Sequence, residues 1–261
     1  MVLGSYEDAA SIASHVYKAR TNALGSEHLD TLFALQCLAT SWRDLGRYDE
    51  AEAAQRRVLE ARQRILGCQH KDSIESMELL AMTIGPQKRL DEAEAIELEA
   101  LEIRRAVFPD NHADTIMAIG NLSSTWYCQG KYTEAEAGTK QALEHFKLTF
   151  GPCHLFTMAS TELLGSIYYE QGRYEEADAM ASATIGQRRE MSLPGTITAI
   201  YNLGLSRWKL GRWKEAIELM RELAKFGREV RGIEAVYLGY ARTWLEIWEE
   251  EEEETMDLLD L

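Results

Sequence analysis

One nine-residue pattern recurs at a fixed interval and constrains the fold of this 261-residue chain more than any other feature. It first spans residues 24–32 (LGSEHLDTL) and returns 42 residues later as LGCQHKDSI, then as FPDNHADTI and as FGPCHLFTM. Four of the six histidines therefore stand in strict register: His28, His70, His112 and His154. A fixed period in this range is typical of stacked-repeat architectures, in which each repeat buries its apolar face on its neighbours.

A second motif travels with the first. It begins at Gly46 as GRYDEA and recurs as KRLDEA, GKYTEA, GRYEEA and GRWKEA, at steps of 42 residues except for a last step of 39. Counting back 42 residues reaches Gly4, where GSYEDA repeats the motif. The chain therefore begins in the middle of a repeat, and we expect it to be a fragment of a longer protein.

Between these motifs the sequence predicts pairs of helices. Apolar residues spaced three and four apart indicate a first helix from about Thr31 to Leu45 and a second from about Tyr48 to Ile65. Asp30, Asp72 and Asp114 are predicted as N-caps of the first helices. The first helices should end at glycines that tolerate a left-handed conformation, namely Gly46, Gly130, Gly172 and Gly211.

Basic residues gather in the last turns of the second helices, as at Arg62 and Arg64 or at Arg104 and Arg105. Acidic residues stand in the first turns of the same helices, as at Asp49 and Glu50. This polarity matches the helix dipole, so we interpret the basic residues as dipole partners and not as ligand sites.

The helix–Gly-x-Tyr-x-x-Ala–helix unit resembles the tetratricopeptide repeat (TPR). A small residue follows a leucine in each first helix, as the family requires where two helices cross closely; these residues are Ala39, Ala81, Ser123, Gly165 and Gly204. The 42-residue period with its LGxxHxDT junction is similar to the kinesin light chain variety and to the repeats at the C-terminal end of fungal-type NB-ARC (NLR-like) proteins. The sequence departs from the pattern at Pro86, at Phe156 and in the fifth repeat, which lacks the histidine junction.

The resemblance implies an all-α fold, a right-handed superhelical solenoid of antiparallel helix pairs with about five full repeats and half-repeats at both ends. Residues 1–248 are expected to form this single solenoid, with helix pairs at 30–66, 72–107, 114–149, 156–190 and 195–230. A half-repeat is expected at 4–22 and a capping helix at 234–250, where Trp244, Ile247 and Trp248 would cover the open end. Residues 249–261 form an acidic tail that we expect to be disordered.

Composition limits the class of partner and the compartment. With 28 basic and 43 acidic residues, the chain has a net charge of −15 and no electrostatic reason to bind nucleic acid. The sequence has no apolar run long enough for a membrane span and no signal pattern at its N-terminus. Four cysteines without metal-like spacing favour a reducing compartment, the cytosol or the nucleus, and of the two we expect a cytoplasmic protein.

The sequence offers no chemistry that would indicate an enzyme or a cofactor. The registered histidines invite a metal hypothesis, but stacked repeats lie about 10 Å apart, too far for successive histidines to share one ion. We expect each histidine to pack in its junction and to hydrogen-bond the backbone there. No phosphate-binding loop, nucleophile elbow or HExxH motif occurs, so we predict no catalytic residues, no metal site and no cofactor.

The resemblance implies that the first helices line a concave groove that binds a protein or peptide. Tyrosine, tryptophan, methionine and arginine are enriched at binding hot spots, and an asparagine can clamp a peptide backbone because its amide both donates and accepts. The predicted groove residues are Phe33, Arg43, Met82, Met117, Asn121, Tyr127, Tyr169, Tyr201, Asn202 and Trp208.

The leading functional hypothesis is therefore a protein–protein interaction module. The resemblance implies the ligand-sensing repeat region of a larger NB-ARC/NLR-like signalling protein, or alternatively a kinesin light chain-like cargo adaptor. A further alternative is a structural or oligomerisation arm that self-associates through exposed solenoid ends. A last possibility is autoinhibition, with residues 256–261 (MDLLDL) occupying a groove.

Overall fold

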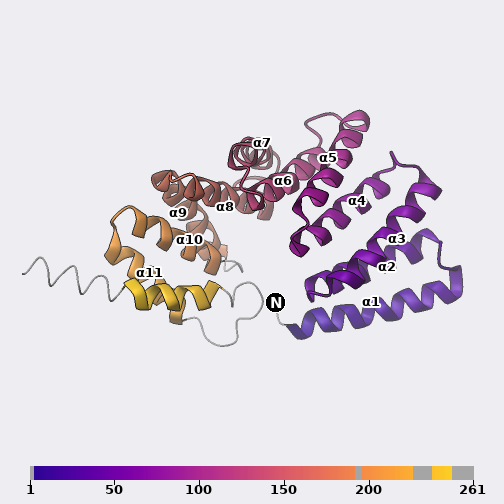
Figure 1. Ribbon diagram of the computed structural model, residues 1–261, viewed down its shortest axis with the longest axis horizontal. Coiled ribbons are helices and arrows are strands. Elements are labelled where there is room, and N and C mark those ends of the chain that lie inside the picture. Colours follow the sequence, from indigo (N-terminus) through magenta and orange to yellow (C-terminus); the bar gives the residue numbers. More distant parts are fainter. Residues whose placement is uncertain (1–2, 192–195, 226–236, 249–261) are drawn as a thin grey trace, which may run out of the picture. The chain divides into compact units, whose positions relative to one another are not determined.

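The computed structural model describes residues 3–191, 196–225 and 237–248, and every regular element among them is helical (Figure 1). The all-α prediction is therefore confirmed. The helices are α1 (Leu3–Leu24), α2 (Leu29–Asp44), α3 (Tyr48–Leu66), α4 (Lys71–Ile84), η1 (Gly85–Gln87), α5 (Leu90–Val107), α6 (Ala113–Cys128), α7 (Tyr132–Phe150), α8 (Leu155–Glu170), α9 (Tyr174–Met191), α10 (Thr196–Lys209) and α11 (Trp213–Lys225), followed by helical residues 237–248. The predicted acidic tail, with its MDLLDL segment, lies outside the described residues.

The chain divides into two compact units, residues Met1–Gly138 and Thr139–Leu261. In the first unit each helix from α1 to α6 packs on the next, and α2 also contacts α4. In the second unit α8, α9, α10 and α11 pack in the same consecutive way, and α8 contacts α10. We call α2, α4, α6, α8 and α10 the first helices of their repeats, and α1, α3, α5, α7, α9 and α11 the second helices.

Histidines, and not aspartates, cap the first helices. His70 lies at the N-cap of α4 in an extended conformation, and its Nδ1 accepts a hydrogen bond from the backbone N–H of Asp72 at 3.2 Å. His28, His112 and His154 make the same contact at the starts of α2, α6 and α8. The prediction that Asp30, Asp72 and Asp114 are the caps is wrong because each lies inside its helix, two residues after the capping histidine. The prediction that the histidines hydrogen-bond the backbone is confirmed.

The first helices end where the sequence predicts. Gly46, Gly130, Gly172 and Gly211 all have positive φ angles, between 73° and 77°. In the second repeat the equivalent position is Lys88, which adopts the same left-handed conformation with φ 65°. Pro86 stands within η1 just before it, so this first helix ends at Ile84 and a 3-10 turn completes the connection.

Close packing inside each repeat uses the small residue of the first helix. A Cβ added to Gly165 would lie 3.2 Å from Met180 Cβ and 3.7 Å from the carbonyl oxygen of Ala177, both on α9. A Cβ on Gly204 would likewise lie 3.7 Å from the carbonyl oxygen of Ala216 on α11. The motif alanines that face these positions are almost fully buried: Ala51, Ala93, Ala135, Ala177 and Ala216 are at most 2% exposed.

Polar contacts join successive repeats. Glu52 on α3 accepts hydrogen bonds from Gln87 at 2.9 Å and from Arg89 at 2.7 Å. One repeat later Glu94 on α5 accepts from Gln129 at 2.9 Å and from Lys131 at 2.7 Å. These hydrogen bonds lower the pKa of Glu52 and Glu94 although partial burial opposes them, so both carboxylates stay ionised. The turns after α4 and α6 are thereby tied to the second helix of the preceding repeat.

Arg62 and Arg104 are buried and do more than complement a helix dipole. Arg62 Nη1 donates to Gln36 Oε1, to the backbone oxygen of Asp72 at 3.0 Å and to Ser76 Oγ at 2.9 Å. Arg104 makes a bidentate pair with Glu78. The interpretation of these two arginines as dipole partners omits this role: their side chains turn inward and join their own repeat to the start of the next. Arg64 and Arg105 remain on the surface.

Candidate partner-binding surfaces

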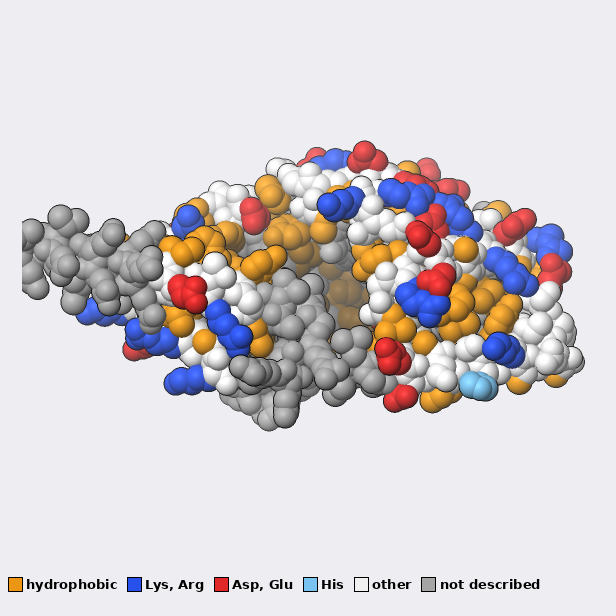
Figure 2. Space-filling model, turned by 60° about the horizontal axis from the view of Figure 1, so that its bottom comes forward, with side chains coloured by type: hydrophobic (Ala, Val, Ile, Leu, Met, Phe, Trp, Pro, Cys, Tyr) orange, Lys and Arg blue, Asp and Glu red, His pale blue; other side chains and the backbone are white. Residues whose placement is uncertain are grey.

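Three apolar side chains are exposed on successive first helices of the first unit. Phe33 on α2 is 52% exposed, Met82 on α4 is 41% exposed and Met117 on α6 is 37% exposed. All three belong to the predicted groove set. On the face drawn in Figure 2, hydrophobic side chains lie between acidic and basic ones, so the apolar surface is divided into small areas. Phe33 and Met117 share one repeat position, which Glu75 holds on α4, and Met82 lies seven residues after Glu75. Exposed apolar side chains on successive first helices are the feature that most favours a partner on this surface.

Polar residues around this surface are largely occupied with one another. Glu75 on α4 accepts a hydrogen bond from Gln36 Nε2 on α2 at 3.3 Å, which joins the two first helices. Arg43 donates twice to Asp44 beside it, at 3.0 and 3.1 Å. Arg43 is thus partly neutralised by its neighbour and is not an isolated cation for an acidic ligand.

Two exposed cysteines stand on the same helices and were not selected from the sequence. Cys37 occupies on α2 the repeat position that Asn121 occupies on α6, and Cys128 ends α6. Burial raises the pKa of both thiols, and the acidic residues Glu75 near Cys37 and Glu97 near Cys128 act in the same direction. Both thiols therefore stay protonated at neutral pH and are weak nucleophiles.

Three predicted groove aromatics occupy one repeat position, and each packs on the aromatic residue of its own turn motif. Tyr127 lies 5.9 Å from Tyr132, Tyr169 lies 5.4 Å from Tyr174, and Trp208 lies 6.3 Å from Trp213, measured between ring centroids. Burial raises the pKa of Tyr169 to about 12. These rings are half-buried, so each has a packing role at the helix pair besides any contact with a ligand.

In the second unit, helical residues 237–248 cover two of the predicted groove residues. Tyr201 is only 8% exposed, and its hydroxyl oxygen accepts a hydrogen bond from Trp244 Nε1 at 3.1 Å. Trp208 stacks on Trp248 with ring centroids 4.4 Å apart and planes 4° apart. Trp248 is buried, whereas Trp244 and Ile247 keep 38% and 39% of their surface exposed.

The two predicted asparagines differ in their surroundings. Asn202 on α10 donates from Nδ2 to Ser166 Oγ on α8 at 3.3 Å, so its amide links two first helices. Asn121 on α6 is half-buried. Because Asn202 uses one of its two N–H groups on Ser166, its other amide groups remain to be satisfied by water or by a ligand.

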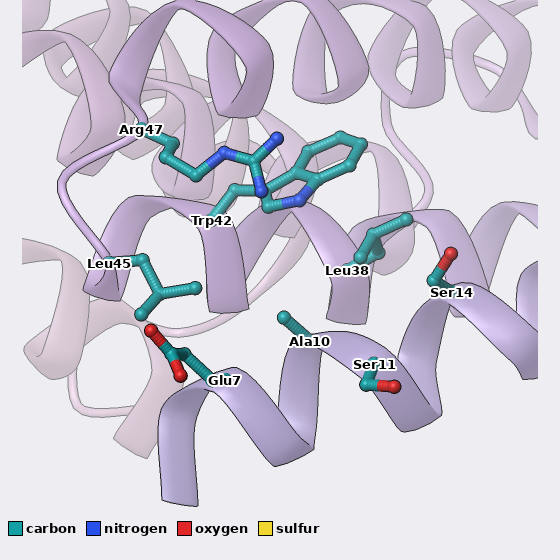
Figure 3. A pocket seen from close by; sticks show the side chains of 8 residues that line it. All are labelled: Glu7, Ala10, Ser11, Ser14, Leu38, Trp42, Leu45 and Arg47. Carbon is teal, nitrogen blue, oxygen red and sulfur yellow. The ribbon is translucent and has the colours of Figure 1, made fainter. Parts of the chain in front are cut away.

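A cavity of about 620 Å³ opens between α1 and α2 (Figure 3). Ala10 and Leu45 line it at the repeat positions that hold Glu52 and Gln87 one repeat later. The polar contacts that join later repeats are therefore missing at this junction. Arg47, on the cavity wall, pairs instead with Glu50 and lies over the Trp42 ring at 5.4 Å.

Residues 3–191, 196–225 and 237–248 contain neither a candidate metal site nor a candidate membrane-spanning helix. Within these ranges no group of three or more His, Cys, Asp or Glu side chains is placed to hold a metal ion. No helix in the same ranges is long and apolar enough to cross a membrane.

Models of known protein families match the repeats of this chain. A tetratricopeptide repeat model matches residues 34–106 and 114–190, and a second tetratricopeptide repeat model matches residues 163–229. The chain belongs to the tetratricopeptide repeat family. A search of curated protein sequences finds no match.

Solved structures agree with this assignment and confirm the TPR solenoid as the fold class. BtubC (BKLC) from P. vanneervenii has 18% identity and a TM-score of 0.68, with 87% of this chain and 95% of that chain covered. A Podosopora anserina putative kinesin light chain with nearly identical TPR-like repeats has 20% identity and a TM-score of 0.64, with 77% and 99% covered. A Rap protein complexed with competence and sporulation factor has 15% identity and a TM-score of 0.69, with 88% and 64% covered. At these identities the likeness concerns the fold alone.

Proposed function

We propose that this TPR chain is a protein–protein interaction module that binds a peptide or protein partner through its first helices. The observation that carries the proposal is the exposure of Phe33, Met82 and Met117 on three successive first helices. A flexible methionine and an aromatic ring fit apolar side chains of a partner, and such residues contribute much of the energy of a binding surface. On this proposal the chain acts by binding and not by catalysis, and it needs no cofactor.

The family and one structural neighbour support this function. TPR arrays generally serve as protein interaction modules, and the Rap protein of similar fold was solved in complex with competence and sporulation factor. We extend the proposal to the rest of the predicted surface, namely Arg43, Asn121, Tyr127, Tyr169, Tyr201, Asn202 and Trp208. For Tyr201 and Trp208 this role requires that helical residues 237–248 move or form part of the surface, since these residues cover both rings.

The biological setting can be proposed at a finer level. The 42-residue period with its LGxxHxDT junction favours the ligand-sensing repeat region of an NB-ARC/NLR-like signalling protein, and the upstream sequence of the parent gene tests this directly. A nucleotide-binding ATPase encoded there would support the receptor; its absence would contradict it. The alternative is a kinesin light chain-like cargo adaptor, which the similarity to the Podosopora anserina structure favours. We place either protein in the cytoplasm because all four cysteines are free thiols.

A peptide-binding experiment tests the module itself. Random peptides displayed on phage are selected on the wild-type chain, and fluorescence anisotropy then gives the affinity of the strongest selected peptide. The triple variant Phe33→Ala, Met82→Ala, Met117→Ala should bind that peptide at least about tenfold more weakly, because it removes the exposed apolar side chains of three first helices.

The matched control carries three substitutions on second helices: Ile65→Ala, Leu98→Ala and Val107→Ala. These side chains are 43%, 45% and 44% exposed, so the control removes a similar amount of exposed apolar surface. It should bind the peptide as the wild type does. Equal losses in both triple variants, or none in the first, would refute a first-helix binding surface.

A further inference from the structure

A carboxylate recurs at one position of the second helices and accepts hydrogen bonds from the repeat that follows. These hydrogen bonds run from Arg89 Nη1 to Glu52 at 2.7 Å, from Trp126 Nε1 to Glu94 at 2.8 Å and from Arg212 Nη1 to Asp178 at 3.4 Å. On α1 the same position holds Ala10. Because the three carboxylates face the following repeat, the loss of the acceptor at Ala10 does not depend on what adjoins the other face of α1.

The donors of this junction are present although their acceptor is missing. Trp42 and Arg47 hold the positions of the tryptophan and the arginines that donate in the later repeats. Arg47 donates from Nε and Nη2 to Glu50, as Arg89 does to Glu92. Among the described residues, Arg47 Nη1 and Trp42 Nε1 have no hydrogen-bond partner. Two donors are therefore available at the place where a carboxylate is absent.

The space left by the missing carboxylate is the cavity of about 620 Å³ between α1 and α2. Figure 3 shows the side chain of Ala10 pointing across this space toward the Trp42 ring, with Arg47 on the same side as Trp42. Leu38 and Leu45 add apolar wall. Pockets for small molecules have volumes of roughly 300–1,000 Å³ and combine an apolar lining with a few polar groups. The cavity meets both criteria.

Glu7 also lines the cavity, beside Leu45, and its charge opposes an anion. Glu7 is exposed, so solvent screens this charge. Two later second helices carry an acid at the same place, three residues before the recurrent carboxylate: Asp49 before Glu52 and Asp91 before Glu94. An acid at the position of Glu7 is therefore compatible with a carboxylate at the position that Ala10 leaves empty.

We propose that the cavity between α1 and α2 binds a small organic acid. Its carboxylate takes the place of the missing glutamate and accepts hydrogen bonds from Arg47 Nη1 and Trp42 Nε1, and its apolar body lies against Ala10, Leu38 and Leu45. A charge-assisted hydrogen bond from a guanidinium is about twice as strong as one between neutral groups, which favours a carboxylate over a neutral acceptor.

The size of the cavity favours a small molecule over an acidic side chain of a protein partner, since one such side chain would leave most of the space unfilled. The inference is independent of the peptide-binding function, because none of Phe33, Met82 and Met117 lines the cavity. A chain that fails to bind peptides through its first helices could therefore still bind the acid.

Nuclear magnetic resonance of the full 261-residue chain tests the proposal. The indole N–H signal of Trp42 is identified by its absence in the Trp42→Phe variant. The probe is 4-phenylbutyrate, which should shift this signal in a saturable way with a Kd on the order of 1 mM, as expected for a ligand of this size. The neutral 4-phenylbutyramide, which has the same shape, should bind at least about tenfold more weakly.

Substitutions then locate the site. Ala10→Glu supplies the carboxylate of the later repeats, so it should shift the Trp42 signal without ligand and abolish binding of the probe. His15→Glu adds the same charge at an exposed position of α1 that does not line the cavity, and it should bind the probe as the wild type does. Arg47→Gln should weaken binding at least about tenfold, and Glu7→Gln should strengthen it roughly twofold.

Three results would overturn the proposal: no shift of the Trp42 signal with 4-phenylbutyrate, equal binding of the amide, or unchanged binding by both Ala10→Glu and Arg47→Gln. The capped peptide acetyl-Gly-Glu-Gly-amide is the second probe and should bind more weakly than 4-phenylbutyrate. Tighter binding of this peptide would replace the small organic acid by an acidic side chain of a protein partner as the ligand.

Discussion

Arg104 on α5 donates from Nε and Nη2 to the two carboxylate oxygens of Glu78 on α4, at 2.6 and 2.7 Å. Both side chains are nearly buried, and Asp114 at the start of α6 lies 3.6 Å from the same guanidinium. Burial alone would lower the pKa of Arg104, but the hydrogen bonds and charges of these acids outweigh it and raise the pKa. The same repeat positions hold Arg62 and Gln36 one repeat earlier, where burial dominates and lowers the pKa of the arginine. The Arg104–Glu78 pair therefore holds α4 and α5 together, and the contact of Arg104 with Asp114 joins this repeat to α6.

Removing one partner of this pair should be costly. In Arg104→Ala, Glu78 would keep a buried charge without its counter-ion, and we expect the free energy of unfolding to fall by about 3 kcal/mol. The neighbouring Arg105 is half-exposed and pairs with the exposed Asp110 at 3.3 Å. Arg105→Ala should therefore change stability by only a few tenths of a kcal/mol. Urea unfolding of both variants measures the difference, and equal losses would contradict the buried pair.

The N-caps make a second prediction. His70→Ala removes the acceptor of the Asp72 backbone N–H, and we expect a loss of about 1 kcal/mol, whereas His70→Asn should retain most of the stability because asparagine also caps helices. Asp72→Ala should cost less than His70→Ala, since its carboxylate only favours the positive end of α4. Thermal or urea unfolding ranks the three variants. A larger loss in Asp72→Ala would restore the aspartate as the cap.

The helix pairs could be predicted from the sequence because several local signals mark the ends of the helices in each repeat. Glycines at the ends of first helices and apolar residues spaced three and four apart are local signals, and they recur at every repeat. The cap was assigned wrongly because aspartate is the commoner N-cap, while the geometry of a histidine at the preceding junction depends on the backbone conformation of that turn. In the folded chain His28 Nδ1 accepts a hydrogen bond from the Asp30 N–H, a contact that no local sequence signal indicates.

The candidate surface was harder to predict because exposure depends on what packs nearby. Phe33, Met82 and Met117 could be placed on the first helices from their spacing alone. Tyr201 could not be seen as buried, since its cover comes from Trp244, which lies 43 residues further along the chain. The burial of the Arg104 side chain could not be predicted from the sequence either. An arginine in the last turn of a helix looks the same in the sequence whether it faces solvent or a buried glutamate.

Replacing Lys88, whose backbone is in the left-handed conformation, by glycine should stabilise the folded chain. A non-glycine residue with φ near 65° costs about 1–2 kcal/mol relative to its preferred conformations, and glycine recovers this at the expense of a larger entropy loss on folding. We expect Lys88→Gly to raise the free energy of unfolding by about 0.5 kcal/mol. Gly130→Ala, at the equivalent turn with φ 76°, should lower it by about 1 kcal/mol. A destabilised Lys88→Gly variant would show that its side chain makes an additional favourable contact.

Glu97 on α5 is a buried carboxyl whose position in the preceding repeat holds Gln55. It is 5% exposed, and its Oε2 has no hydrogen-bond partner among the described residues. Burial raises its pKa to about 7, a hydrogen bond with Thr125 opposes this, and the charges of Glu78 and Glu94 add to the increase. The folded state therefore holds this proton more tightly than the unfolded state, whose carboxyl has a pKa near 4.5.

The consequence is a stability that falls as the pH rises. Protonated Glu97 contributes its full share to the free energy of unfolding below about pH 4.5. This contribution is lost as the pH rises through about 7, and the loss at higher pH reaches about 3 kcal/mol. Glu97→Gln introduces the residue of the preceding repeat and removes the titration. The variant should be more stable than the wild type at pH 8 and similar to it at pH 4.5, as measured by urea unfolding at both values. Glu99→Gln, an exposed change on the same helix, serves as control, and a Glu97→Gln variant with the wild-type dependence on pH would show that Glu97 is not the titrating group.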